Sequence, residues 1–130
     1  MSPTPNPNSD PRVFFAAERT LLAWVRTGLT IMALGFVVSR FGLFVRLLEL
    51  QAPGAAPREG SGISAILGIA FVVAGSLAIA VSAVQHSRFV VTLPLHDLPA
   101  RYSRSFAVGL SLAVAALGLA LAAYLALGPR

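Results

Sequence analysis

Three arginines and one glutamate stand at the start of a long apolar segment. Arg12, Arg19 and Arg26 follow one another at intervals of seven residues, and Glu18 directly precedes the second of them. Steps of three and four residues keep side chains on one face of a helix, so the three guanidinium groups are expected to form a stripe. A guanidinium is permanently charged, and its planar fork matches carboxylate and phosphate groups. The spacing therefore predicts a positively charged stripe that could bind anions.

Small and polar residues fill most of the positions between these arginines, and large apolar residues occupy the opposite face. An arginine stripe of this kind must be shielded from lipid by other helices, a water-filled cavity, headgroups or an anionic ligand. Glu18 lies at the edge of the stripe, where it is expected to pair with an arginine of a neighbouring helix or another subunit. Stepping by four and three along the stripe gives Arg12, Ala16, Arg19, Ala23, Arg26, Thr30, Ala33, Val37 and Arg40.

The candidate anion-binding or lipid-binding residues are Arg12, Arg19, Arg26 and, after a second apolar segment, Arg88. A plainer interpretation is that they fix the topology, because positive residues collect on the cytoplasmic side of membrane proteins and attract anionic lipid. Both interpretations stay open. The depth of Arg26 within the apolar segment favours a specific site, since an ionisable residue inside a membrane is costly and usually functional.

Other kinds of chemistry find little support in the sequence. The chain has no cysteine, and His86 and His96, with Asp97 nearby, are too far apart to indicate a metal site. We find no nucleophile–base grouping, paired carboxylates, phosphate-binding loop or dinucleotide motif. We therefore expect no enzymatic activity, metal or cofactor. Nucleic acid is not an expected partner either, because the arginines that give the net charge of +5 are divided between the two sides of the predicted membrane domain.

The composition indicates an all-α integral membrane protein with one domain. Of the 130 residues, 56% are hydrophobic and 12% are charged, whereas soluble domains carry about 25% charged residues. The mean hydropathy is +0.78. Residues 63–84 and 106–127 are each free of charge. At 1.5 Å per residue each reaches about 33 Å, enough to cross a hydrocarbon core of about 30 Å.

The first apolar segment is too long for a single crossing. Helical character without proline runs from about residue 13 to residue 48. We expect an amphipathic interfacial helix over 13–25 and a first transmembrane helix over 26–46, with a bend at Gly28 or Gly35. With 63–84 and 106–127 this predicts a three-helix transmembrane bundle. Residues 1–12 are predicted to be a disordered polar tail, and residues 51–62 and 85–105 are predicted loops.

Small residues recur along the second and third predicted spans, which predicts tight helix packing. Because three helices have too little wall to enclose a pore, any transport function would require a homo-oligomer. Trp24, Tyr102 and Tyr124 lie near predicted span ends as interface anchors, and the arginine bias places the N-terminus in the cytoplasm and the C-terminus outside. The small-residue series are Ser61, Gly68, Gly75 and Ser82, and Ser105, Gly109, Ala113, Ala116, Ala120 and Ala123.

The segment from Glu18 to Phe36 resembles the YidH family of small bacterial inner-membrane proteins. That family carries an N-E-R-T-x-L-A-W-x-R-T type of signature at its first membrane helix, although Ala17 replaces the asparagine often found there. The matching residues are Glu18, Arg19, Thr20, Leu22, Ala23, Trp24, Arg26 and Thr27.

A related membrane domain occurs in the fungal vacuolar transporter chaperone complex, where basic residues from several copies line a path for polyphosphate. By this resemblance, Arg12, Glu18, Arg19 and Arg88 fall where that domain has a basic residue, a Glu-Arg pair and a second basic residue. The resemblance implies a homo-oligomer in the bacterial inner membrane that binds or passes a phosphate-like or polyphosphate-like anion, and it does not imply polymerase activity. The alternative is a non-conducting accessory or scaffold subunit whose arginines serve topology and anionic-lipid binding.

Overall fold

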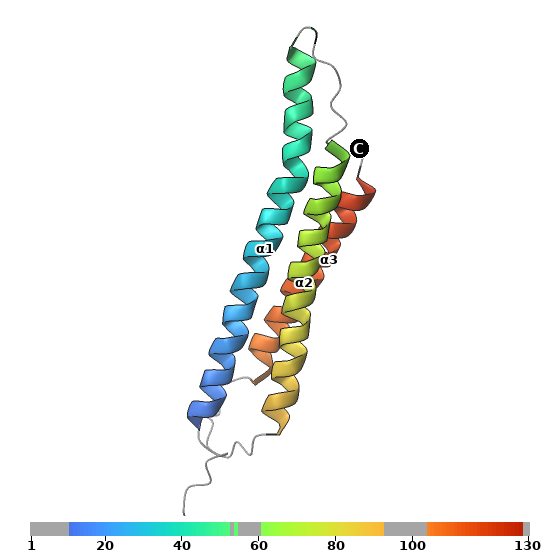
Figure 1. The fold of residues 1–130 in the computed structure, drawn as a ribbon. Helices are drawn as coiled ribbons and strands as arrows, with labels where there is room; N and C mark the ends of the chain where they lie inside the picture. The colour runs from blue at the N-terminus through green and yellow to red at the C-terminus, as the bar shows by residue number, and fades with distance from the viewer. Residues whose placement is uncertain (1–10, 53, 55–60, 93–103, 129–130) are drawn as a thin grey trace, which may run out of the picture.

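Three long α-helices make up almost all of residues 11–52, 54, 61–92 and 104–128, which are the residues that the computed structural model describes (Figure 1). Helix α1 spans Pro11–Gln51, α2 spans Ser61–Val91 and α3 spans Arg104–Leu127. All three are long and apolar enough to cross a membrane, and these ranges contain no strand. The predicted all-α membrane fold with three transmembrane helices is confirmed.

Local sequence signals explain where the helices begin and end. Helix α1 begins at Pro11, since proline suits the first helical position, and it ends two residues before Pro53. Helix α2 runs to Val91, so it includes residues 85–91 that were predicted as loop. Helix α3 ends at Leu127, and the amide of the next residue, Gly128, donates a hydrogen bond to the carbonyl oxygen of Tyr124 at 2.8 Å.

The predicted interfacial helix over residues 13–25 is not a separate element. These residues form the first turns of α1, an uninterrupted helix of 41 residues that is about 60 Å long at 1.5 Å per residue. Phe14 and Leu21 are buried. Leu21 packs with Ala83 of α2, and the ring of Phe14 lies 6.4 Å from the ring of His86. Residues 13–25 therefore continue α1 and pack against α2 instead of forming a separate helix.

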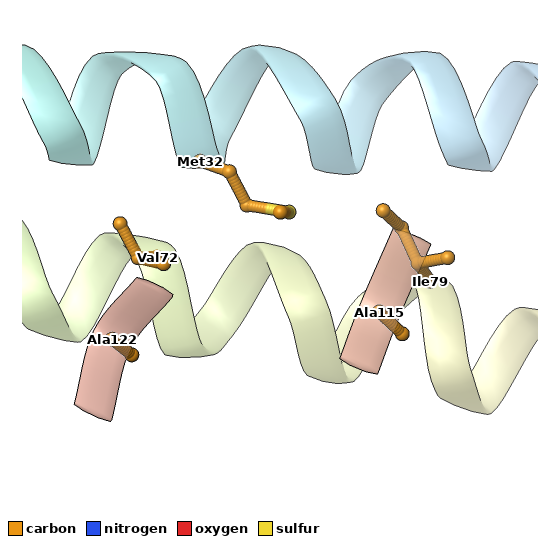
Figure 2. Packing of buried hydrophobic residues seen from close by; sticks show 5 residues of the cluster. All are labelled: Met32, Val72, Ile79, Ala115 and Ala122. Atoms are coloured by element: carbon orange, nitrogen blue, oxygen red, sulfur yellow. The ribbon is translucent and has the colours of Figure 1, made fainter. Parts of the chain in front are cut away.

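Helix α2 is the central element of the bundle. It runs antiparallel to α1 and packs extensively against both other helices, whereas α1 and α3 contact each other only slightly (Figure 1). Where the three helices meet, the side chain of Met32 extends from α1 into the space between α1 and α2, and it forms one buried cluster with Val72 and Ile79 of α2 and Ala115 and Ala122 of α3 (Figure 2).

Glycines bring the backbones of α1 and α2 into close contact. A β-carbon on Gly28 would lie 2.9 Å from the carbonyl oxygen of Gly75, and one on Gly35 would lie 2.6 Å from the carbonyl oxygen of Gly68. The two pairs are seven residues apart on each helix, so the contact repeats every second turn. The close packing predicted for Gly68 and Gly75 is confirmed. Gly28 and Gly35 serve this contact rather than the predicted bend.

The small-residue face predicted for α3 is not the face that packs in this chain. All six predicted positions, from Ser105 to Ala123, are exposed, and a β-carbon on Gly109 would meet nothing within 4 Å. The third helix is rich in alanine all around, so either face permits close approach. The face that packs against α2 consists of Ala107, Ser111, Ala115, Gly118 and Ala122.

Candidate functional site

Arg12, Arg19 and Arg26 lie on the side of α1 that faces away from α2, whereas Arg40, the last position of the predicted stripe, is half-buried. Residues nine apart on a helix are rotated by half a turn relative to each other, because each residue adds about 100°. Leu21, Gly28 and Gly35 all pack against α2, and each stands nine residues after a stripe arginine. Those arginines, in the same order, are Arg12, Arg19 and Arg26, and all three are exposed.

The register of the glycine contacts sets the depth of each arginine. Gly28 lies level with Gly75, and Gly35 lies level with Gly68. The same antiparallel register places Arg19 level with the end of the charge-free segment 63–84 and Arg40 level with its start. Residues 19–40 of α1 therefore lie beside that segment. Arg26 is level with Leu77, which is about 5 Å from the middle of the segment at 1.5 Å per residue.

Small side chains surround Arg26 on the stripe. Ala23, Thr30 and Ala33 are all exposed. The hydroxyl of Thr30 donates to the carbonyl oxygen of Arg26 at 2.9 Å, and that of Thr27 donates to the carbonyl oxygen of Ala23 at 3.0 Å. Because these hydroxyl hydrogens are engaged within α1, the guanidinium of Arg26 is the side-chain donor that this part of the stripe offers to a ligand. The small neighbours leave space for another helix or a ligand to approach it.

Arg88 does not join the stripe. It is exposed in the last turn of α2, nine residues after the fully buried Ile79, so it points away from the helices that cover Ile79. It does share one end of the bundle with Arg12, because the contact between Phe14 and His86 joins these two helix ends. Glu18 is half-buried at the edge of the stripe.

The predicted aromatic anchors occupy different environments. Trp24 is half exposed and lies level with Ile79, five residues inside the end of the charge-free segment. Tyr124 is exposed near the end of α3, and the guanidinium carbon of Arg40 lies 5.8 Å from the centre of its ring. Tyr102, His96 and Asp97 lie outside the described residues, as do residues 1–10 of the predicted tail.

A groove between α1 and α2, which the sequence analysis did not predict, contains a buried histidine. This histidine groove has a volume of about 410 Å³, and its lining includes Thr20, Trp24, Gln85, His86 and Phe89. His86 is 6% exposed, and among the described residues its Nε2 atom has no hydrogen-bond partner. Among all the residues that the structure describes, no group of three acidic or histidine side chains could hold a metal ion.

A second cavity lies at the opposite end of the bundle, where the last third of α1 meets the start of α2 and the end of α3. This arginine cavity has a volume of about 220 Å³, and its lining includes Ser39, Arg40, Arg46, Gly62 and Tyr124. The sequence analysis placed Arg40 at the end of the arginine stripe and did not predict that Arg40 and Arg46 line a cavity. The cavity forms only where residues of all three helices come together, and no local sequence pattern predicts which helix segments lie next to each other.

Together, the three apolar helices and their packing define a small multi-pass membrane protein. The chain belongs to the DUF202 family, because the model of that family, described as a domain of unknown function, matches residues 12–92. The match takes in the arginine stripe, the glycine contacts and α2, and it ends before α3. No curated protein and no solved structure matches the chain.

Proposed function

We propose that this membrane protein assembles with copies of itself so that the arginine stripes face a common axis and bind or pass a phosphate-containing anion. The observation that carries the proposal is the position of Arg26, which is exposed on its own chain and level with the interior of the charge-free segment. A charged side chain at the bilayer centre costs about 2.5–3.5 kcal/mol even on insertion scales that allow relaxation. Arg26 therefore needs a shield.

The position of the stripe favours another copy of the chain as that shield. Because the stripe lies opposite the face of α1 that packs against α2, neither α2 nor α3 can cover Arg26 without unpacking the bundle. Ala23, Thr30 and Ala33 leave α1 flat beside Arg26, and small residues are what allow helices to approach closely in lipid. Several copies of the chain are needed for transport, because three helices are too few to surround an aqueous path.

The charge of the stripe favours an anion between the copies. Arginines that converge on an axis repel one another unless a negative group lies between them, and the repulsion grows where water is excluded. Guanidinium groups bind phosphate through paired, charge-assisted hydrogen bonds. The resemblance of the segment around Arg19 to the membrane domain of a polyphosphate-handling complex supports the same ligand class. In this arrangement Arg12 and Arg19 collect the anion at the cytoplasmic end, and Arg26 holds it deeper.

A non-conducting accessory subunit is the second candidate, and the position of Arg88 favours it. Arg88 and Arg12 lie at the same end of the bundle but on different faces, which suits contacts with anionic headgroups and a cytoplasmic orientation of that end. In this case an acidic residue of a larger partner, or lipid headgroups reached by a long side chain, would shield Arg26.

Anion flux from liposomes tests the proposal. Wild-type protein reconstituted with trapped phosphate or tripolyphosphate should release it, and Arg26→Gln should reduce the rate by about tenfold, as expected for the loss of one charged hydrogen-bonding group. Arg26→Lys should retain part of the flux. Leu77→Ala is the matched control, since Leu77 is exposed at the same depth on α2.

The oligomeric state is measured on the same preparations by mass photometry or native mass spectrometry. A stable oligomer of wild-type protein that neither conducts nor binds phosphate would contradict the proposal and favour the accessory role. Unchanged flux in Arg26→Gln would also contradict it. If Arg26→Gln fails to insert, the Arg26→Lys variant, which keeps the charge, provides the comparison.

A further inference from the structure

The arginine cavity does not include Arg12, Arg19 or Arg26, the residues on which the proposed function depends. It lies at the other end of α1, and two guanidinium groups line it together with a tyrosine and several apolar side chains. Among its described lining residues there is no carboxylate, so the cavity has a net positive charge. The principal apolar lining residues are Leu43, Ile66, Ile69 and Leu125.

The environment of Arg40 leaves its hydrogen-bond donors available to a ligand. Its guanidinium carbon lies over the ring of Tyr124 at 5.8 Å from the ring centre, and this cation–π contact occupies one face of the guanidinium. The N–H donors of a guanidinium lie in its plane rather than on its faces. A group that enters the cavity between Arg40 and Arg46 can therefore accept hydrogen bonds from both residues.

The depth of the cavity indicates what kind of ligand reaches it. Arg40 is level with the start of the charge-free segment 63–84, and Arg46 lies six residues farther along α1, which is about 9 Å. Headgroup regions add about 5–7 Å to each side of the hydrocarbon core. Arg40 therefore stands at the boundary between acyl chains and headgroups, and Arg46 stands near the outer edge of the headgroup region, from which its long side chain can reach back toward Arg40. Phospholipid phosphates lie at this depth.

We infer that the arginine cavity binds the phosphate of an anionic phospholipid, with Arg40 and Arg46 on the phosphate and the apolar wall against the first part of an acyl chain. The volume of about 220 Å³ suits a headgroup rather than a whole lipid, because sites for complete small molecules are usually larger, at about 300–1,000 Å³. A net charge of −1 on the headgroup matches the positive cavity better than a zwitterion does.

Native mass spectrometry of the delipidated full chain tests the inference. The protein is titrated with phosphatidylglycerol or phosphatidylcholine of the same acyl composition, and the dissociation constant of the first bound lipid is measured for each. For wild-type protein we expect phosphatidylglycerol to bind about tenfold more tightly, which corresponds to one charged hydrogen-bonding interaction. In the double variant Arg40→Gln/Arg46→Gln, this ratio should fall to near one.

Two further variants separate the cavity from general effects of charge and folding. Arg40→Lys/Arg46→Lys keeps both charges, so it should retain part of the preference, and it serves as the folded comparison if the glutamine variant unfolds. Phe44→Gln changes an exposed residue outside the cavity lining, so the preference should stay unchanged. Circular dichroism confirms helix content for each protein.

Three outcomes would overturn the inference. Equal affinity of wild-type protein for the two lipids would show that the cavity does not distinguish an anionic headgroup from a zwitterionic one. An unchanged preference in Arg40→Gln/Arg46→Gln would show that the lipid binds at another site. Displacement of phosphatidylglycerol by millimolar inorganic phosphate, with no such displacement in the double glutamine variant, would identify free phosphate as the ligand instead of lipid. Persistence of phosphatidylglycerol in the presence of phosphate supports the lipid.

Discussion

Gly35 and Gly68 face each other so closely that a β-carbon on Gly35 would lie 2.6 Å from the carbonyl oxygen of Gly68. The obstacle is backbone, which cannot rotate away as a side chain can. Gly35→Ala should therefore separate α1 from α2 and lower the free energy of unfolding by about 1–3 kcal/mol, the usual cost of overpacking. Titration with SDS in mixed micelles, followed by circular dichroism, measures this change.

Gly109→Ala is the matched control, because a β-carbon there meets nothing within 4 Å. Alanine favours a helix over glycine by about 0.5–1 kcal/mol, so this variant should be as stable as wild-type protein or slightly more stable. A Gly35→Ala variant with wild-type stability would contradict the close glycine contact. Clear destabilisation by Gly109→Ala would show that the exposed face of α3 packs against another molecule.

The arginine stripe could be predicted from the sequence, because one helix is enough to define it. The spacing of Arg12, Arg19 and Arg26 fixes a common face whatever the helix packs against, and the structure shows that face exposed. The three apolar helices could be predicted for the same reason, since length and hydropathy are local properties.

The pairing of helix faces could not be predicted, because it depends on two segments at once. The sequence of α1 alone predicts a bend at Gly28 or Gly35, because the contact of these glycines with Gly75 and Gly68 depends on a second helix. Helix α3 offers small residues in every direction, so its spacing pattern could not distinguish the packed face from the exposed one. The arginine cavity was missed because Arg46 and Tyr124 meet only when all three helices are placed.

Cysteine cross-linking tests the proposed assembly directly, since the chain has no natural cysteine. If the stripes of neighbouring copies approach each other, Thr30→Cys should form disulfide-linked dimers in membranes on mild oxidation. Leu77→Cys, exposed on α2 at a similar depth, should form few. Non-reducing electrophoresis measures the dimer fraction. Equal cross-linking at the two positions would show random collisions and would count against the arrangement around a common axis.

The contact between Arg40 and Tyr124 should contribute measurably to stability. The two side chains connect the last third of α1 to the end of α3, two helices that otherwise contact each other little. Cation–π contacts contribute about 0.5–1 kcal/mol at exposed sites. A double-mutant cycle with Arg40→Gln and Tyr124→Leu should give a coupling energy of this size, whereas Tyr124→Phe, which keeps the ring, should preserve it. Additive effects would show that the ring and the guanidinium do not interact.

The buried imidazole of His86 should make the bundle less stable than an apolar side chain would. It is 6% exposed and packs near Phe14, and its Nε2 atom lacks a partner among the described residues. A buried polar atom without a hydrogen bond costs about 1–3 kcal/mol. His86→Leu removes that atom and keeps most of the volume, so it should raise the free energy of unfolding in the SDS titration by about 1 kcal/mol or more.

Two comparisons separate polarity from packing at this position. His86→Ala also removes the imidazole but leaves a cavity, so its stability should be lower than that of His86→Leu by about 2 kcal/mol or more. Gln85→Leu changes the exposed neighbour on the same turn and should have little effect. If His86→Leu is instead clearly less stable than wild-type protein, the prediction is wrong, and the imidazole makes a favourable interaction that outweighs the cost of its buried Nε2 atom.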